Sequence, residues 1–199
     1  MAKRRRRVPI FTLAFVCAAL LVSAGPAPLR EQLAFERSAV VAGEWWRVWT
    51  GHLVHWEPSL AVWDLGALAL LGGWVESRSR AELLAVLGLG AFVSGVAVLV
   101  LRPDLASYQG SSALASALFV NACLRLLARA NDPYARATAA FGLLGLAAKV
   151  GLESAGISPT GIPGALESVA VAHLAGALAG GVVRYAFELA APGRERALA

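Results

Sequence analysis

The sequence predicts an all-α, polytopic membrane protein built as a bundle of six transmembrane helices. Of its 199 residues, 58% are hydrophobic and only 16% are charged, and the mean hydropathy is +0.63. Soluble domains are typically about 45–50% apolar and about 25% charged, so this chain has too much apolar surface for a water-soluble domain of its size. The same composition excludes intrinsic disorder, and the glycines and prolines follow no collagen-like or low-complexity period.

Six apolar runs, separated by short polar joints, are the second observation. A bilayer core of about 30 Å needs about 20 residues of helix, and backbone in lipid must satisfy its own hydrogen bonds, so the runs are predicted as helices and not strands. The predicted spans are residues 8–25, 58–75, 83–101, 111–127, 137–157 and 166–190. They form one membrane domain, 8–190, between a cytoplasmic basic N-terminus (1–7) and a cytoplasmic tail (191–199).

The placement of basic residues predicts how the helices are oriented. The net charge is +5, and 13 of the 18 Lys and Arg residues fall in four segments on one side of the predicted bundle, residues 1–7, 76–82, 125–136 and 184–199. The positive-inside rule therefore puts both ends in the cytoplasm, and the charge reports topology rather than a nucleic-acid partner. The first run could instead be a cleaved signal peptide ending near Val22-Ser23-Ala24, but the orientation favours a retained helix that anchors a cytoplasmic N-terminus.

Residues 26–57 are the most polar stretch and carry four tryptophans beside several charges. Tryptophan prefers the membrane–water interface, so this segment is predicted to be an interfacial loop on the outer side.

Polar residues near or within the spans are the candidates for chemistry, since such groups are costly in lipid and face a cavity or a partner. Ser112 begins the fourth span on the outer side, and His173 lies about two turns into the sixth span from the same side, so the two share a depth. A hydroxyl and an imidazole at one depth could form a nucleophile–base pair. The alternative is that both only hydrogen-bond within the bundle. Small residues on both spans, Gly176 and Gly180 among them, would let these helices approach closely.

The motifs around these residues resemble the rhomboid family of intramembrane serine proteases. Gly110-Ser111-Ser112-Ala113 is similar to the family's Gly-x-Ser-Gly nucleophile motif, and Ala172-His173-Leu174 with Gly176 and Gly180 to its last core helix. Trp46-Arg47, Thr50, His55 and Asp64 resemble its first loop and second helix, and Leu71-Gly72-Gly73 with Glu76 and Arg78 the turn that follows. These elements occur in the family's order over about residues 44–185.

Within the family, the chain looks most like the rhombosortases, which are compact six-helix members without an extra domain. Trp63-Asp64 in the second span and Lys149 with Glu153 in the fifth fit that group. The resemblance implies a serine endopeptidase of the bacterial inner membrane whose active site opens to the outer side. It implies as partners the transmembrane or C-terminal tail segments of exported proteins, the latter with Gly-Gly, hydrophobic and basic parts, together with the lipid bilayer.

Under this resemblance Ser112 and His173 are catalytic, His55, Asp64 and Gly110 support the site and its oxyanion hole, and neither a cofactor nor a metal is required. The chain departs from the family pattern at three positions. Ala113 stands for the motif's last glycine, Leu60 for a second-helix histidine that donates to the oxyanion, and Asp64 for the usual asparagine. An ionised Asp64 would repel an oxyanion, whereas a protonated one could donate to it.

The remaining polar residues have simpler structural interpretations. Lys149 and Glu153 are four apart and are expected to pair on one helix face, with a substrate-tail contact as the alternative. His52 is expected at the interfacial surface, because it lies beside Thr50 in the interfacial loop. The His52–His55 spacing would suit a metal pair on a helix, but no third ligand lies nearby in the sequence. Two other function classes stay open: an inactive rhomboid-like protein that binds membrane segments, and a small transporter with a polar path through His173, Asp64 and Glu153, although no internal repeat supports the latter.

Overall fold

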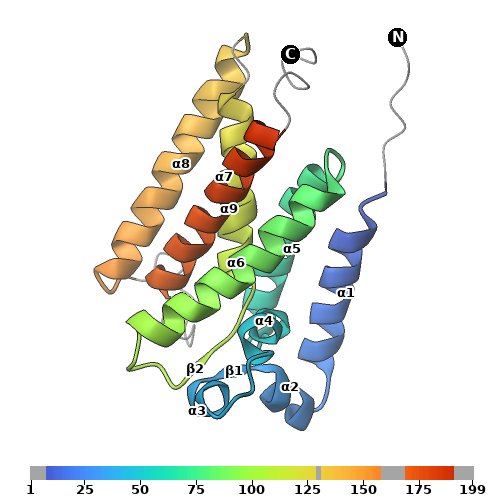
Figure 1. Cartoon of the computed structure of the whole chain (residues 1–199), viewed down its shortest axis with the longest axis vertical. Coiled ribbons are helices and arrows are strands. Elements are labelled where there is room, and N and C mark those ends of the chain that lie inside the picture. Colours follow the sequence, from blue (N-terminus) through green and yellow to red (C-terminus); the bar gives the residue numbers. More distant parts are fainter. Residues whose placement is uncertain (1–7, 129–130, 158–168, 191–199) are drawn as a thin grey trace.

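The six predicted spans are all helices in the computed structural model, which describes residues 8–128, 131–157 and 169–190 (Figure 1). These long helices are α1 (Ile10–Ala24), α5 (Pro58–Glu76), α6 (Arg80–Leu101), α7 (Ser112–Leu127), α8 (Pro133–Ser154) and α9 (Ala170–Ala190). Four of them, α5, α6, α8 and α9, are long and apolar enough to cross a membrane, while α1 and α7 are shorter apolar helices of 15 and 16 residues. The predicted helical membrane bundle is therefore confirmed.

Local capping explains where the helices differ from the predicted spans. The span predicted from residue 83 begins earlier, at Arg80, because Ser79 caps α6 by accepting a 3.2 Å hydrogen bond from the Glu82 N–H. The span predicted from residue 137 likewise begins at Pro133, capped by Asp132. The basic N-terminus 1–7, the tail 191–199 and the start of the last predicted span at 166 lie outside the described residues.

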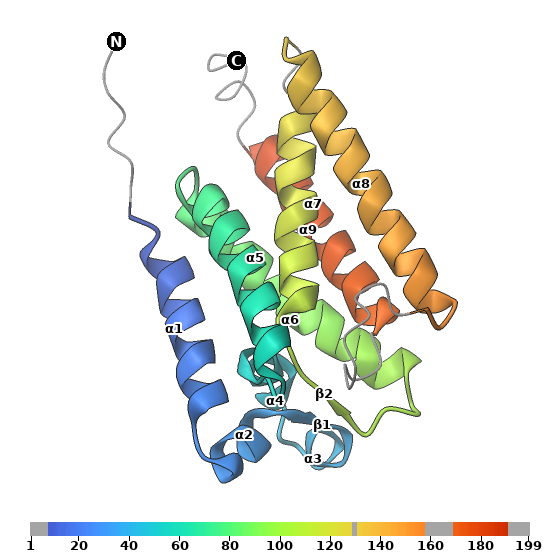
Figure 2. The ribbon, with the colours of Figure 1, turned by 180° about the vertical axis from the view of Figure 1, so that it is seen from behind.

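The segment predicted as an outer loop is folded and packs at one end of the bundle, opposite the end where α1 begins and α9 ends (Figures 1 and 2). It contains α2 (Ala27–Leu33), β1 (Phe35–Glu36), α3 (Arg37–Val41), α4 (Arg47–Thr50) and a 3₁₀ turn (Gly51–Leu53). β1 pairs antiparallel with β2 (Ser107–Tyr108), which leads into α7. The buried guanidinium of Arg47 ties the segment together by donating to the carbonyls of Glu31 and Ala34 at 2.6 and 2.8 Å.

A second arginine, Arg37, joins this segment to the end of α6. Its guanidinium donates hydrogen bonds of 2.5–3.0 Å to the carbonyl oxygens of Val98, Leu99, Leu105 and Arg102. These carbonyls lie in and just after the last turn of α6, where a cation is favoured by the helix dipole. Those of Val98 and Arg102 each also accept one backbone N–H, from Arg102 and Leu105, so Arg37 supplies a second donor to them.

Replacing Arg37 with methionine should therefore lower the free energy of unfolding by about 1–3 kcal/mol, because the carbonyls lose charged donors. Thermal unfolding in detergent measures the change. The matched control is Arg136→Met at an exposed position on α8, which should leave the unfolding temperature unchanged. Equal effects of the two substitutions would contradict the capping role.

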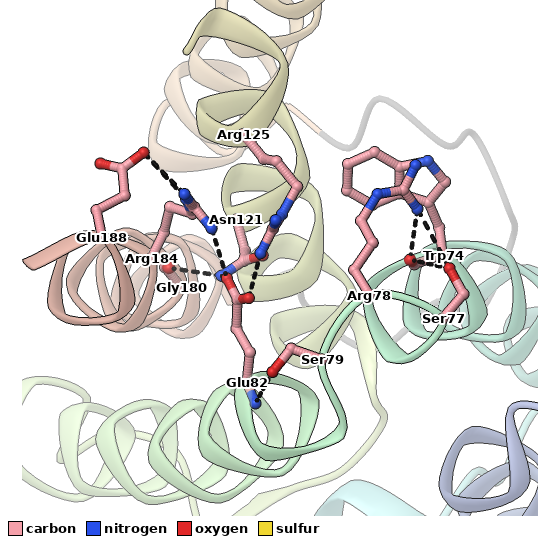
Figure 3. Close-up of polar contacts among 10 residues, drawn as sticks. All are labelled: Trp74, Ser77, Arg78, Ser79, Glu82, Asn121, Arg125, Gly180, Arg184 and Glu188. Carbon is pink, nitrogen blue, oxygen red and sulfur yellow. Dashed lines mark hydrogen bonds and ion pairs between the residues drawn. The ribbon is translucent and has the colours of Figure 1, made fainter. Parts of the chain in front are cut away.

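The opposite end of the bundle is held by a buried cluster around Glu82 (Figure 3). The Glu82 carboxylate, 1% exposed, accepts from Asn121 Nδ2 at 3.0 Å on α7, is paired with Arg125 of the same helix, and lies 3.3 Å from Arg184 Nη1 on α9. Arg184 also pairs with Glu188 at 2.9 Å. This cluster joins α6, α7 and α9 in one network.

The helix nearest the N-terminus is attached to α5 by another buried carboxylate. Glu76 Oε2 accepts from the Thr12 N–H and hydroxyl, both at 2.9 Å, and Oε1 accepts from the Phe11 N–H at 3.1 Å. The first turn of α1 thereby receives acceptors for backbone donors that the helix itself leaves unsatisfied.

Candidate active site

Ser112 is the first residue of α7, at the end of the bundle next to the folded segment. A tight turn precedes it, in which Gly110 has φ +101°, a conformation that L side chains rarely adopt. A Cβ at this glycine would also lie 3.3 Å from Asp64 Oδ2. The motif glycine is thus required by the backbone turn that starts α7, and a Cβ there would also make a tight contact with Asp64.

His173 faces Ser112 from α9. Its Nε2 lies 2.8 Å from Ser112 Oγ, within hydrogen-bond distance, and the histidine is 5% exposed while the serine is half-buried. The two residues predicted as a nucleophile–base pair are therefore brought together by helices, although they are 61 positions apart in sequence.

Two glycines allow this close approach of α7 and α9. A Cβ built on Gly176 would lie 2.2 Å from the Ala113 carbonyl oxygen, and one built on Gly180 would lie 2.0 Å from that of Ala117. No side chain other than hydrogen fits at either position, so the predicted small-residue packing of these helices is confirmed. Ala113, where the motif has glycine, is fully buried in this contact.

A second imidazole contacts the residue just before α7. His55, 4% exposed, precedes α5, and its Nε2 is 3.3 Å from the Ser111 backbone nitrogen and 3.4 Å from Asp64 Oδ2. His55, Asp64 and Gly110, predicted together as site support, thus form one cluster next to Ser112. Leu60 leaves the second helix without its usual histidine, and His55 from the preceding loop brings an imidazole to Asp64 instead.

His52 is not at the surface, and that expectation is wrong. Only 1% of it is exposed, its Nδ1 donates to the Gly110 carbonyl at 3.0 Å, and its ring packs edge-on against Tyr108. Burial lowers the pKa of His52, so the ring stays neutral and serves as an internal support for the Gly110 turn. The 3₁₀ turn that carries His52 packs against α6, and the spacing of residues in the sequence does not predict this contact.

Lys149 and Glu153 form the expected pair on α8, with Nζ 2.5 Å from Oε1. Both side chains also reach His173, whose Nδ1 lies 2.7 Å from Glu153 Oε2 and 2.9 Å from Lys149 Nζ. The pairing rule for one helix does not predict this contact. The depth of Glu153 in the membrane is the feature of the sequence that could have predicted it. Glu153 lies near the end of its span, level with His173, on the side where Ser112 begins α7.

Within the described residues, no three His, Cys, Asp or Glu side chains are grouped so that they could hold a metal ion. The side chains that meet at the site come from the loop before α5 and from α5, α7, α8 and α9, and they are His55, Asp64, Ser112, Lys149, Glu153 and His173. Such an arrangement suits proton transfer between a hydroxyl and an imidazole and electrostatic support of the resulting charges.

Comparison with known proteins agrees with this geometry. The family model described as the Rhomboid domain matches residues 42–188, which is most of the chain and includes every site residue described above. No curated protein matches the sequence. The match and the helical membrane fold together identify the chain as a member of the rhomboid family.

Proposed function

We propose that this protein is an intramembrane serine endopeptidase in which Ser112 is the nucleophile and His173 the general base. Rhomboid proteins are generally serine intramembrane proteases. The observation that carries the proposal is the 2.8 Å contact between Ser112 Oγ and His173 Nε2 at the buried junction of α7 and α9. This is the distance at which an imidazole can take a hydroxyl proton.

The reaction follows from that contact. As Ser112 Oγ bonds to the peptide carbonyl carbon, its proton passes to Nε2 of His173. The tetrahedral intermediate then collapses, the C–N bond breaks, and the Nε2 proton passes to the leaving amine. Water, activated by the same imidazole, hydrolyses the acyl ester and restores both residues. An amine in place of water would give transfer instead of hydrolysis.

The negative oxygen of the intermediate would form beside the N-terminus of α7. Backbone N–H groups in the first turn of a helix have no intrahelical acceptor, and the helix dipole favours negative charge there. His55 and Asp64, 3.4 Å apart, lie next to this helix start and supply further polar contacts. Loss of one oxyanion donor typically costs about 10²–10³ in rate, so the departure at Leu60 is compatible with activity.

Substrate class and orientation are the finer parts of the proposal. We place the protein in the bacterial inner membrane with its site opening outward, where it would process exported proteins with Gly-Gly, hydrophobic and basic C-terminal tails. Support for the orientation comes from the sequence, in which 13 of the 18 Lys and Arg residues fall in the four segments predicted to be cytoplasmic. Support for the substrate comes from the resemblance to rhombosortases alone.

Fluorophosphonate labelling of the purified full chain in detergent tests the catalytic proposal. The wild type should be labelled, and Ser112→Ala should lose both labelling and cleavage of a membrane substrate. Ser116→Ala is the matched control one turn further along α7 and should keep both. Full cleavage by Ser112→Ala, or no labelling of the wild type, would contradict the proposal, and the latter result would favour a membrane binding protein.

Substrate class is tested separately with two membrane substrates that differ only in the tail. One carries the Gly-Gly, hydrophobic and basic tail, and the other has both glycines replaced by leucine. Preferential cleavage of the first supports the sorting role, whereas equal cleavage points to a rhomboid protease with other substrates.

A further inference from the structure

The side of His173 that faces away from Ser112 is occupied by two charged groups from α8. Glu153 Oε2 lies 2.7 Å from Nδ1, and Lys149 Nζ lies 2.9 Å from the same atom. The Glu153 side chain is 1% exposed, whereas that of Lys149 is 35% exposed. The carboxylate is therefore shielded from water, and the ammonium lies toward the surface.

These two neighbours require different tautomers of the His173 ring. Nδ1 offers one position in the ring plane, which holds either a proton or a lone pair. A carboxylate only accepts, so the bond to Glu153 needs Nδ1–H and leaves a lone pair on Nε2 for the Ser112 proton. An ammonium only donates, so a bond from Lys149 would put the ring proton on Nε2, which could then no longer act as the base.

We propose that Glu153 is a positioning residue that completes a Ser112–His173–Glu153 triad by holding His173 in the Nδ1–H tautomer. This inference rests on the proposed function. The contact to Glu153 is the shorter of the two, and Lys149 Nζ has a still closer acceptor in Glu153 Oε1, at 2.5 Å. Both distances favour an arrangement in which the carboxylate accepts from the ring and from the ammonium at once.

The same carboxylate supports the charge that catalysis creates. When the Ser112 proton reaches Nε2, His173 becomes an imidazolium with its Nδ1–H still directed at Glu153 Oε2. Opposite charges at this distance attract strongly where water is excluded, and no proton needs to move to the carboxylate. The chain thus supplies from α8 the third group that a Ser–His pair alone lacks.

Lys149 has a separate part in this arrangement. A carboxylate buried without a partner is costly, and Lys149, one turn before Glu153 on the same helix, neutralises it. We infer that Lys149 orients Glu153. It binds Oε1 of the carboxylate and leaves Oε2 for His173.

Glu153→Gln tests the inference, because it keeps the size of the side chain but replaces the acceptor oxygen pair with an amide. The chain has three histidines, so ¹⁵N spectra of the imidazoles in detergent can report the His173 tautomer once a His173→Gln sample assigns its signals. We expect Nδ1–H in the wild type and a shift to Nε2–H in Glu153→Gln. Steady-state kinetics should show kcat reduced by about 10²–10⁴ with KM within about threefold, since the wrong tautomer costs a serine protease triad about 10⁴ in kcat.

Two further variants serve as controls. Glu188→Gln makes the same chemical change in an ion pair at the far end of α9 and should leave both the His173 signals and kcat at wild-type values. Lys149→Gln removes the competing ammonium charge but keeps the acid, so it should retain the Nδ1–H tautomer and lose less activity than Glu153→Gln.

The inference is overturned if Glu153→Gln keeps the Nδ1–H tautomer, if it leaves kcat within about threefold of the wild type, or if Lys149→Gln moves the proton to Nε2. The tautomer is read without substrate. A wild-type protein that neither labels nor cleaves would therefore contradict the proposed function, while the spectra still decide the role of Glu153.

Discussion

Alanine at Gly176 or Gly180 is expected to push α7 and α9 apart and to remove activity. The added Cβ would lie 2.2 Å from the Ala113 oxygen in the first case and 2.0 Å from the Ala117 oxygen in the second. These are backbone atoms, which cannot rotate away, so the helices must separate by more than about 1 Å to restore ordinary van der Waals contact. Overpacking of a core typically costs about 1–3 kcal/mol and occasionally more, and we expect the upper end because two helix backbones must move.

The loss of activity should be larger than the loss of stability suggests. His173 is three residues before Gly176, and Ala113 directly follows Ser112, so separation at this contact lengthens the distance from Ser112 Oγ to His173 Nε2. A misplacement of about 1 Å can cost about 10² in rate. The rate of fluorophosphonate labelling measures this effect, and thermal unfolding in detergent measures the stability.

Gly181→Ala is the matched control on the same helix. Its Cβ would meet only side-chain atoms, Leu124 Cδ1 at 3.7 Å and Val120 Cγ1 at 3.8 Å, which is ordinary contact. Wild-type labelling and an unfolding temperature within about 2 °C of the wild type are expected for this variant. The same result for Gly180→Ala would contradict the close approach of the two helices.

The parts of the fold that the sequence predicts well are those with a one-dimensional signal. Apolar length marks the helices, and the small residues Gly176 and Gly180 mark where two helices touch, because both features are written along a single segment. Depth along a span can also be counted residue by residue, which is why Ser112 and His173 can be matched from the sequence. Helix ends are predicted less accurately, since caps such as Ser79 and Asp132 lie outside the apolar runs that define a span.

The contacts that the sequence does not predict depend on the rotation of one helix against another. The four-residue spacing of Lys149 and Glu153 predicts their pairing on α8, but whether that face points to lipid or to His173 is set by how α8 packs on α7 and α9. The position of His52 beside Thr50 in the interfacial loop favours a surface position, while its neighbours in space are the Gly110 turn and α6. The arginines of the inner segments predict topology alone, although Arg125 and Arg184 are ion-paired inside the bundle.

The Glu82 cluster holds α6, α7 and α9 together at the end of the bundle away from the site. α7 and α9 meet at Ser112 and His173 at one end and at Gly176 and Gly180 along their length. At the other end both helices contact Glu82 (Figure 3). Among the described residues, the cluster pairs Glu82 and Glu188 with Arg125 and Arg184. A mutually paired network of this kind in an apolar bundle is suited to fixing the positions of helices.

Glu82→Gln should consequently lower the free energy of unfolding by about 3–5 kcal/mol, because it removes one partner of a buried ion pair and leaves its guanidinium neighbours without their shared carboxylate. Unfolding in mixed micelles of increasing denaturing-detergent content measures the change. Glu188→Gln, an acid of the same cluster whose side chain is 41% exposed, is the control and should cost less than about 1 kcal/mol, as a surface pair does. Equal losses in the two variants would show that burial of Glu82 adds nothing to the stability that its ion pairs contribute.

A double variant locates the stabilisation more closely. If Glu82→Gln and Arg125→Gln together cost less than the sum of the two single changes, the stabilisation lies in the α6–α7 ion pair itself.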